Sequence, residues 1–404
     1  MVIFAKWNDV PVTISFKSNC LTVSIENKNS TTVYSFDRSY RLWTAMIEGI
    51  SYRRGLNGNI VAKWKAGNDV LYRKWLNELE KDQLLEKAHQ TIKLMSDDFF
   101  SAKFQSDFQL SPELITEFKE ISKINPNFYQ NDVKKYEEIY KPVGILPPDQ
   151  YMSVVLQLTE GCSFNTCTFC TFYRDRPFKI KSITDFEIHI LDIKNYLSQS
   201  LNLRRTIFLG DANALVVPTK KLIPLLKIIH KHLDVERMGG LYAFLDGFSG
   251  DKKGVEEYQT LKTLGLKRIY IGLESGYNDL LTFLRKPGKS EDAVSAVHEI
   301  KKAGLSVAII ILLGAGGNKY DQFHVRDTIR IINQMNLDAD DIIYFSELIE
   351  KEGFDYSKDA YLENLLPLTA EERLLQENQI SSGFIFSDKG TPHISRYDIR
   401  DFIY

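Results

Sequence analysis

The stretch SVVLQLTEGCSFNTCTFC (residues 153–170) decides how this chain is organised. Its first part, Ser153 to Leu158, is a short apolar run rich in β-branched side chains, which is typical of a buried strand. The second part gathers three of the 4 cysteines of the chain, Cys162, Cys167 and Cys170, into one loop. We therefore expect three thiols to lie where a strand ends.

The chemistry of sulfur limits what this loop can bind. Thiolates select iron–sulfur clusters, zinc or copper(I), and structural zinc sites and ordinary clusters take four protein ligands. No cysteine follows Cys170, and the nearest downstream histidine, His189, falls in an expected helix. The loop therefore favours a cluster with one iron left open for a small molecule. Cys20 is expected to be a structural thiol, but it could in principle close the cluster. A zinc site completed by another ligand is a further alternative.

The loop resembles that of the radical S-adenosylmethionine (SAM) superfamily, in which three closely spaced cysteines hold a [4Fe–4S] cluster. The four residues between Cys162 and Cys167 are one more than in the commonest family spacing. The resemblance implies two cofactors, the cluster and SAM. It also implies an oxygen-sensitive enzyme in which one electron splits SAM into methionine and a 5′-deoxyadenosyl radical, which abstracts hydrogen from the substrate. A one-electron reductant such as flavodoxin or ferredoxin would be a partner. The catalytic residues and the specific reaction stay unknown.

Composition and charge narrow the class of partner. The 404 residues carry a net charge of -2, which gives no sign of bulk attraction to nucleic acid or to a membrane. The longest apolar runs, such as Val307 to Leu313, fall short of a membrane span. Few cysteines and no signal-peptide core predict a cytoplasmic protein. We expect a small-molecule substrate. The alternatives are an RNA substrate, for which only local arginine patches are present, and an electron-transfer or sensor protein without SAM chemistry.

The first 150 residues are expected to form two parts. Residues 1–65 contain short alternating segments separated by turn formers, which predict a small antiparallel β region. Residues 66–150 are expected to be helical, with amphipathic stretches from Asp69 to Met95 and from Pro112 to Ile124. This part ends in a Pro-rich linker from Asn125 to Asp149, where we place the domain boundary.

After Tyr151 the pattern changes to short apolar strands that alternate with amphipathic helices, as in βα units. The expected strands are 153–158, 206–209, 241–245, 268–273, 307–313 and 342–345. Six units predict an α/β fold with a partial (β/α)6 TIM-like barrel over residues 151–348, the fold that the resemblance also implies. Residues 349–404 are expected to add a C-terminal cap, made of a helix and a docking tail. Active sites of barrels lie at the C-terminal ends of the strands, so the residues after each strand should carry the chemistry.

Two strand ends offer candidate SAM contacts. After the second strand, Gly210 would let a ligand approach the backbone, and Asp211 offers a carboxylate to an ammonium group. The resemblance places the amino group of SAM here, and a helix cap by Asp211 is the alternative. After the fourth strand, Glu274 and Ser275 resemble the ribose-binding strand end of the family. An incidental surface turn is the alternative there.

Further candidates lie nearby in the expected barrel. Arg285 or its neighbour Lys286 could meet the SAM carboxylate, although a solvated helix face accounts for both equally well. Gly314 and Gly316 follow the fifth strand and resemble the glycine-rich segment near adenine in the family. Phe169 resembles the aromatic residue between the second and third cysteines of the family, which lies against adenine. His324 opens the next helix, and it could act as an acid or base or be a satisfied helix-end histidine.

Overall fold

The computed structural model describes residues 1–67, 70–248, 252–350, 354–386 and 388–404. These residues fall into two compact units. Unit 1 contains Met1–Pro142, Leu191–Arg205 and Ile403–Tyr404, and unit 2 contains Val143–Ile190 and Thr206–Phe402. Helix α4 (Ile183–Leu197) therefore begins in unit 2 and ends in unit 1.

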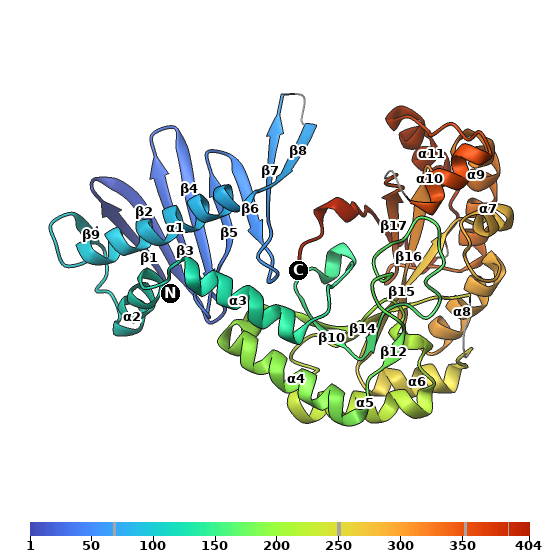
Figure 1. Cartoon of the computed structure of the whole chain (residues 1–404), viewed down its shortest axis with the longest axis horizontal. Coiled ribbons are helices and arrows are strands. Elements are labelled where there is room, and N and C mark those ends of the chain that lie inside the picture. Colours follow the sequence, from blue (N-terminus) through green and yellow to red (C-terminus); the bar gives the residue numbers. More distant parts are fainter. Residues whose placement is uncertain (68–69, 249–251, 351–353, 387) are drawn as a thin grey trace. The chain divides into compact units, whose positions relative to one another are not determined.

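Unit 1 is built on a nine-stranded antiparallel sheet with the order β8-β7-β6-β5-β4-β3-β2-β1-β9 (Figure 1). Its strands are β1 (Val2–Trp7), β2 (Val10–Phe16), β3 (Cys20–Asn27), β4 (Ser30–Asp37), β5 (Leu42–Ile47), β6 (Ile50–Arg54), β7 (Ile60–Ala66), β8 (Val70–Trp75) and β9 (Phe104–Ser106). Alternate side chains such as Leu21 and Val23 are fully buried, because successive residues of a strand point to opposite faces. The predicted antiparallel arrangement is confirmed.

Three helices cover the buried face of this sheet: α1 (Glu78–Asp98), α2 (Pro112–Ser122) and α3 (Pro126–Ile139). Two expectations for this region are wrong. The helix expected from Asp69 to Met95 begins only at Glu78, because Asn77 and Glu80 form a capping box, while residues 70–75 continue the hairpin with β7 as β8. Asp69 itself lies outside the described residues.

The second correction concerns the expected linker, most of which is helix α3. Pro126 occupies the first turn of this helix. Proline is favoured there because a backbone N–H in the first turn has no acceptor within the helix, so its absence costs no hydrogen bond. The Asn125 side chain caps the same end by accepting from the Phe128 N–H at 3.2 Å. The chain passes from unit 1 to unit 2 after Pro142.

Unit 2 contains a parallel sheet with the order β10-β13-β14-β15-β16-β17-β18. Its strands are β10 (Ser153–Gln157), β13 (Thr206–Gly210), β14 (Leu241–Leu245), β15 (Leu266–Glu274), β16 (Ser306–Leu313), β17 (Ile342–Glu347) and β18 (His393–Arg396). The first six are the strands predicted from the sequence. Within the described residues β10 and β18 do not pair with each other, so the barrel is partial and open, as predicted.

Helices connect these strands along the outer side of the curved sheet (Figure 1). They are α5 (Thr219–His232), α6 (Val255–Thr263), α7 (Asn278–Phe283), α8 (Ser290–Lys302) and α9 (Gly317–Gln334), and α10 (Asp355–Leu362) and α11 (Ala370–Ser382) follow β17. None of the helices in the described part of the chain has the length and hydropathy needed to cross a membrane.

The C-terminal tail adds the seventh strand, which the sequence did not predict. Strand β18 pairs in parallel with β17, with His393 opposite Ile342 and Arg396 opposite Phe345. The side chains of β18 are mostly exposed, so the segment lacks the apolar alternation by which strands are recognised. The tail therefore extends the barrel sheet as well as docking on it.

Candidate active site

A short antiparallel pair closes the cysteine loop that follows β10. Strand β11 (Thr159–Glu160) pairs with β12 (Lys179–Ile180), which brings the two ends of the loop together. Gly161 has a φ of +74°, and a Cβ added to it would lie 2.8 Å from the Pro177 carbonyl oxygen. The segments at Gly161 and Pro177 thus approach each other more closely than any side chain at position 161 would allow.

The Asp211 carboxylate holds this loop in place. One oxygen accepts from Gln157 Nε2 at 2.7 Å, and the other accepts from the Gly161 N–H at 2.9 Å and from Arg176 Nε at 3.1 Å. Burial raises the pKa of Asp211, and the Arg176 guanidinium opposes that rise. Because both oxygens are engaged inside the protein, the structure gives Asp211 an anchoring role in place of the predicted contact with the SAM amino group. It is not a helix cap either.

A second arginine fastens the other half of the loop. Arg174 donates from Nε to the Cys170 carbonyl oxygen at 3.1 Å and from Nη2 to the Cys167 carbonyl oxygen at 2.9 Å. Its Nη1 reaches Asp355 at the start of α10, at 2.7 Å. One guanidinium therefore fixes the backbone of two of the three cysteines.

All three cysteines line one cavity of about 250 Å³ at the C-terminal ends of the strands. Phe169 lines it from the loop, and Glu274 lines it from the end of β15. Most of the remaining wall is apolar: Ile145, Phe164, Phe172, Phe244, Leu245, Ile310, Leu312, Leu348, Ile349, Phe354 and Ile399. The cavity lies where the barrel rule places an active site.

The three sulfur atoms are the donor set that an iron–sulfur cluster takes. The cysteines are free and partly buried. Burial raises the pKa of Cys167 to about 12, against the pull of the Lys286 ammonium, and burial also raises the pKa of Cys170. A bound metal reverses this preference, because a nearby cation stabilises the thiolate. Among the described residues no three potential ligands converge on a site for a single ion, whereas a cubane offers separate irons to separate thiolates.

A buried ion pair forms another part of the cavity wall. Lys286 Nζ donates to Glu274 Oε1 at 3.0 Å, and both side chains are about nine-tenths buried. Burial alone would lower the pKa of Lys286, but Glu274 and the Cys167 thiol hold it above its usual value, so the ammonium stays charged. A Cβ on Gly272 would lie 2.4 Å from Glu274 Oε1, so glycine leaves the space that this pair occupies.

Lys286, and not Arg285, lies at the cavity. Arg285 points its guanidinium to Asp359 at 2.7 Å, and about half of its side chain is exposed. The sequence alone could not separate these neighbours, because both follow α7 in a turn without helical periodicity. Of these two neighbours, only Lys286 is placed to contact a ligand in the cavity.

The glycines after β16 do not line the cavity either. The Gly314 N–H donates to Gln376 Oε1 at 2.9 Å, and the Gly316 N–H donates to the Tyr356 hydroxyl at 2.9 Å. Both backbone donors are thus used by side chains of the C-terminal part of the chain. The cavity wall at this strand is formed by Ile310 and Leu312 instead.

Gly210 and Ser275 also lie behind the wall. The Gly210 carbonyl oxygen accepts from Thr159 Oγ1 at 3.0 Å. Ser275 is fully buried and hydrogen-bonds to His324 on α9 at 2.7 Å. Of the predicted contacts, the structure thus brings the three cysteines, Phe169 and Glu274 to one cavity.

Two polar residues at this cavity were not predicted as ligand contacts. Asn213 accepts from the Asp246 N–H at 3.0 Å and donates to Ser163 Oγ at 3.2 Å, so it links the ends of β13 and β14 to the cysteine loop. Both Asn213 and Asp246 line the cavity. Their positions directly after predicted strands were the signal that could have found them.

Residues 156–327 match the family model of the radical SAM superfamily. This part of the chain is a radical SAM domain. Among the curated proteins none matches the sequence. The domain found at residues 156–327 is of an enzyme class, and the cofactors of that class, a [4Fe–4S] cluster and SAM, are those predicted from the sequence.

Several solved structures resemble this chain weakly. Coproporphyrinogen III oxidase (HemN) from Escherichia coli is 12% identical with a TM-score of 0.42, over 57% of this chain and 52% of that one. SuiB from Streptococcus suis is 12% identical with a TM-score of 0.40, over 87% and 71%. HydG, a maturase of the [FeFe]-hydrogenase, is 14% identical with a TM-score of 0.39, over 80% and 72%. This chain spans about half the length of the first.

Proposed function

We propose that this protein binds a [4Fe–4S] cluster through Cys162, Cys167 and Cys170 and cleaves SAM reductively. The 5′-deoxyadenosyl radical would then abstract hydrogen from a small-molecule substrate that is still unidentified. A one-electron reductant such as a flavodoxin or ferredoxin is the partner that this reaction requires. When bound, the cluster would supply the electron for SAM cleavage and an open iron for the methionine part of SAM.

The observation that carries this proposal is the shared cavity. Three thiols that are close in sequence line the same cavity as Glu274 and Lys286. Glu274 is the last residue of β15, and Lys286 follows that strand in the chain. The match to the radical SAM family covers the same part of the chain. Without the cysteines the cavity would be an ordinary apolar pocket at a barrel mouth.

The other wall residues have two roles in this proposal. Lys286 and Glu274 form a buried ion pair, so the ammonium and the carboxylate have already lost their water. A zwitterionic ligand such as SAM can therefore pair its own carboxylate with Lys286 and its own cationic or hydrogen-bond donor groups with Glu274. The apolar side chains exclude water, which protects a reactive radical from side reactions. A mostly apolar wall also favours a small organic substrate over a phosphate-rich polymer.

The test is anaerobic reconstitution of the full chain with iron and sulfide. We expect about four irons per chain, an EPR signal of the reduced cluster that changes when SAM is added, and formation of 5′-deoxyadenosine. Cys162→Ala, Cys167→Ala and Cys170→Ala should each lose the cluster, whereas Cys20→Ala, on β3 of unit 1, is the matched control and should keep it. Bound zinc, a cluster indifferent to SAM, or cluster loss in Cys20→Ala would overturn the proposal.

A further inference from the structure

The turn that follows β15 has an unusual backbone. Opposite β16 the register shifts between Gly272 and Glu274, which makes a β-bulge at the end of the strand. Glu274 then has a φ of +60°, in the left-handed region that residues other than glycine rarely adopt. The Ser275 N–H turns back to donate to the Leu273 carbonyl oxygen at 2.7 Å. Such a conformation persists only where the surroundings hold it, so the contacts of this turn are informative.

Ser275 ties the turn to helix α9. Its side chain is fully buried, and its Oγ lies 2.7 Å from His324 Nδ1. The same Oγ accepts the N–H of Tyr277 at 3.0 Å. Because the oxygen already accepts one hydrogen bond from the backbone, its own hydrogen is available for the neutral imidazole nitrogen of His324.

His324 suits this acceptor role. It is fully buried on α9, and burial lowers its pKa to about 4, so the imidazole is neutral at physiological pH. If Nδ1 accepts from Ser275, the ring hydrogen sits on Nε2, which has no hydrogen-bond partner in the described part of the chain. Nδ1 also lies 3.3 Å from Thr328 Oγ1, so all the polar contacts described for this ring are made through Nδ1, on the side that faces the turn.

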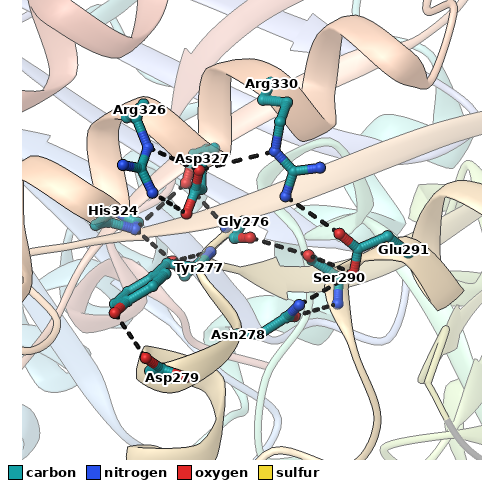
Figure 2. Close-up of polar contacts among 12 residues, drawn as sticks. Gly276, Tyr277, Asn278, Asp279, Ser290, Glu291, His324, Arg326, Asp327 and Arg330 are labelled. Atoms are coloured by element: carbon teal, nitrogen blue, oxygen red, sulfur yellow. Dashed lines mark hydrogen bonds and ion pairs between the residues drawn. The ribbon is translucent and has the colours of Figure 1, made fainter.

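A second contact holds the next residue of the turn to the same helix. The Gly276 N–H donates to Thr328 Oγ1 at 2.9 Å, and its carbonyl oxygen accepts from Ser290 Oγ at 2.9 Å. A Cβ on Gly276 would lie 2.2 Å from the Asp327 carbonyl oxygen, so the turn is pressed directly against α9. Figure 2 shows these contacts between Gly276, Ser290 and α9, with His324 and Tyr277 beside them.

An exposed ion pair joins α8 to α9, and hydrogen bonds of Asn278 join α7 to α8. Arg330 reaches Glu291 at 3.1 Å, and Glu291 accepts from Asn278 Nδ2 at 3.1 Å (Figure 2). The Asn278 Oδ1 in turn accepts from the Ser290 N–H at 2.8 Å. The helices that contact the turn, α8 and α9, are therefore also linked to each other.

We propose that His324 is a positioning residue, which acts through Ser275 to hold the left-handed turn at Glu274 and so aims the Glu274 carboxylate into the cysteine-lined cavity. The inference rests on the proposed function of that cavity as the SAM site. His324 would then affect ligand affinity, although its side chain does not line the cavity. The alternative of a histidine that only fills the core makes different predictions in two measurements.

The first measurement needs no cofactor. Amide hydrogen exchange is compared between wild type and His324→Leu, which removes the acceptor and leaves an apolar side chain of suitable size. We expect amides 275–277 to exchange at least about 10-fold faster in the variant, while amides of β17 stay unchanged. His324→Asn, whose amide oxygen can take the place of Nδ1, should restore slow exchange. Unchanged exchange at 275–277 in His324→Leu would overturn the proposal.

The second measurement is a double-mutant cycle on SAM affinity, with calorimetry on cluster-loaded protein corrected for iron content. His324→Leu and Glu274→Ala should each weaken SAM binding by about 10-fold, the size of one hydrogen bond, and the double variant should bind no more weakly than Glu274→Ala. Additive losses would show that His324 does not act through Glu274. If His324→Leu does not fold, Ser275→Ala removes the same contact with a smaller change.

The two proposals can fail separately. If wild-type protein binds no SAM, the proposed function fails, and the exchange measurement still decides whether His324 holds the turn. If wild type binds SAM but the cycle is additive, only the positioning role of His324 is refuted. A lower melting temperature shared by all variants, with unchanged exchange and unchanged SAM affinity, would identify a purely structural histidine.

Discussion

Replacing Asp211 by alanine should release the cysteine loop, because this carboxylate is the buried partner of Arg176. The side chains of the pair are 2% and 7% exposed, and their atoms lie 3.1 Å apart. Removal of one member of a buried ion pair costs about 3–5 kcal/mol. Arg176 keeps its pair with the half-exposed Asp175 at 2.8 Å, so we expect a loss near the lower end of this range. The Gly161 N–H and the Gln157 amide lose their acceptor as well. Typical domains are stable by only about 5–15 kcal/mol, so unit 2 should lose a large part of its stability.

The chain offers a matched control for this loss. Arg174, in the same loop, pairs with Asp355 at 2.7 Å, but those side chains are 34% and 31% exposed. An exposed pair contributes about 0–1 kcal/mol, so Asp355→Ala should be nearly neutral where Asp211→Ala is severe. Each variant removes a carboxylate from an arginine of the same loop. They differ in the burial of that carboxylate and in the two further hydrogen bonds that Asp211 accepts.

Urea unfolding of the cofactor-free protein can separate the two units. All tryptophans of the chain lie in unit 1, so their fluorescence follows that unit, whereas far-UV circular dichroism follows both. These residues are Trp7, Trp43, Trp64 and Trp75. We expect Asp211→Ala to lower the midpoint seen by circular dichroism and to move the fluorescence transition less. After reconstitution the variant should also hold less iron. Equal midpoints for Asp211→Ala and Asp355→Ala would refute this reasoning.

Three further outcomes are expected. Lys286→Ala should weaken SAM binding by about 10-fold or more, whereas Arg285→Ala, which breaks only an exposed pair, should change it less than about twofold in the same calorimetric titration. Burial lowers the pKa of His89 and His324 to about 4, so between pH 6.5 and 4 the unfolded chain binds more protons than the folded chain. The free energy of unfolding, which is highest above pH 6.5, should therefore fall by about 3 kcal/mol for each histidine as the pH drops to 4. His89→Gln should flatten the fall of the urea midpoint of unit 1 with decreasing pH, and an unchanged slope would contradict this. Gly272→Ala should displace the carboxylate that pairs with Lys286, weakening SAM binding about 10-fold while iron content, measured in parallel, stays that of wild type.

Local pattern was enough to predict the barrel strands and the cysteine loop. A strand such as 307–313 is a continuous apolar run because both of its faces are buried, so the burial of the strand can be predicted from its own residues. The three cysteines are close in sequence, so no tertiary information was needed to group them. Glu274 was found by the same logic, since it directly follows a recognisable strand.

The predictions that the structure changed depend on partners that are distant in the sequence. Asp211 and Arg285 carry charges that could serve a ligand, and only the packed structure shows that Arg176 and Asp359 already occupy them. Strand β18 has little apolar pattern of its own, because its backbone pairing with β17 holds it in the sheet. Local periodicity thus determined which elements form and where the thiols gather. Tertiary structure decided which polar groups face the cavity, because the partner of a buried charge is set by packing between segments that the sequence does not place side by side.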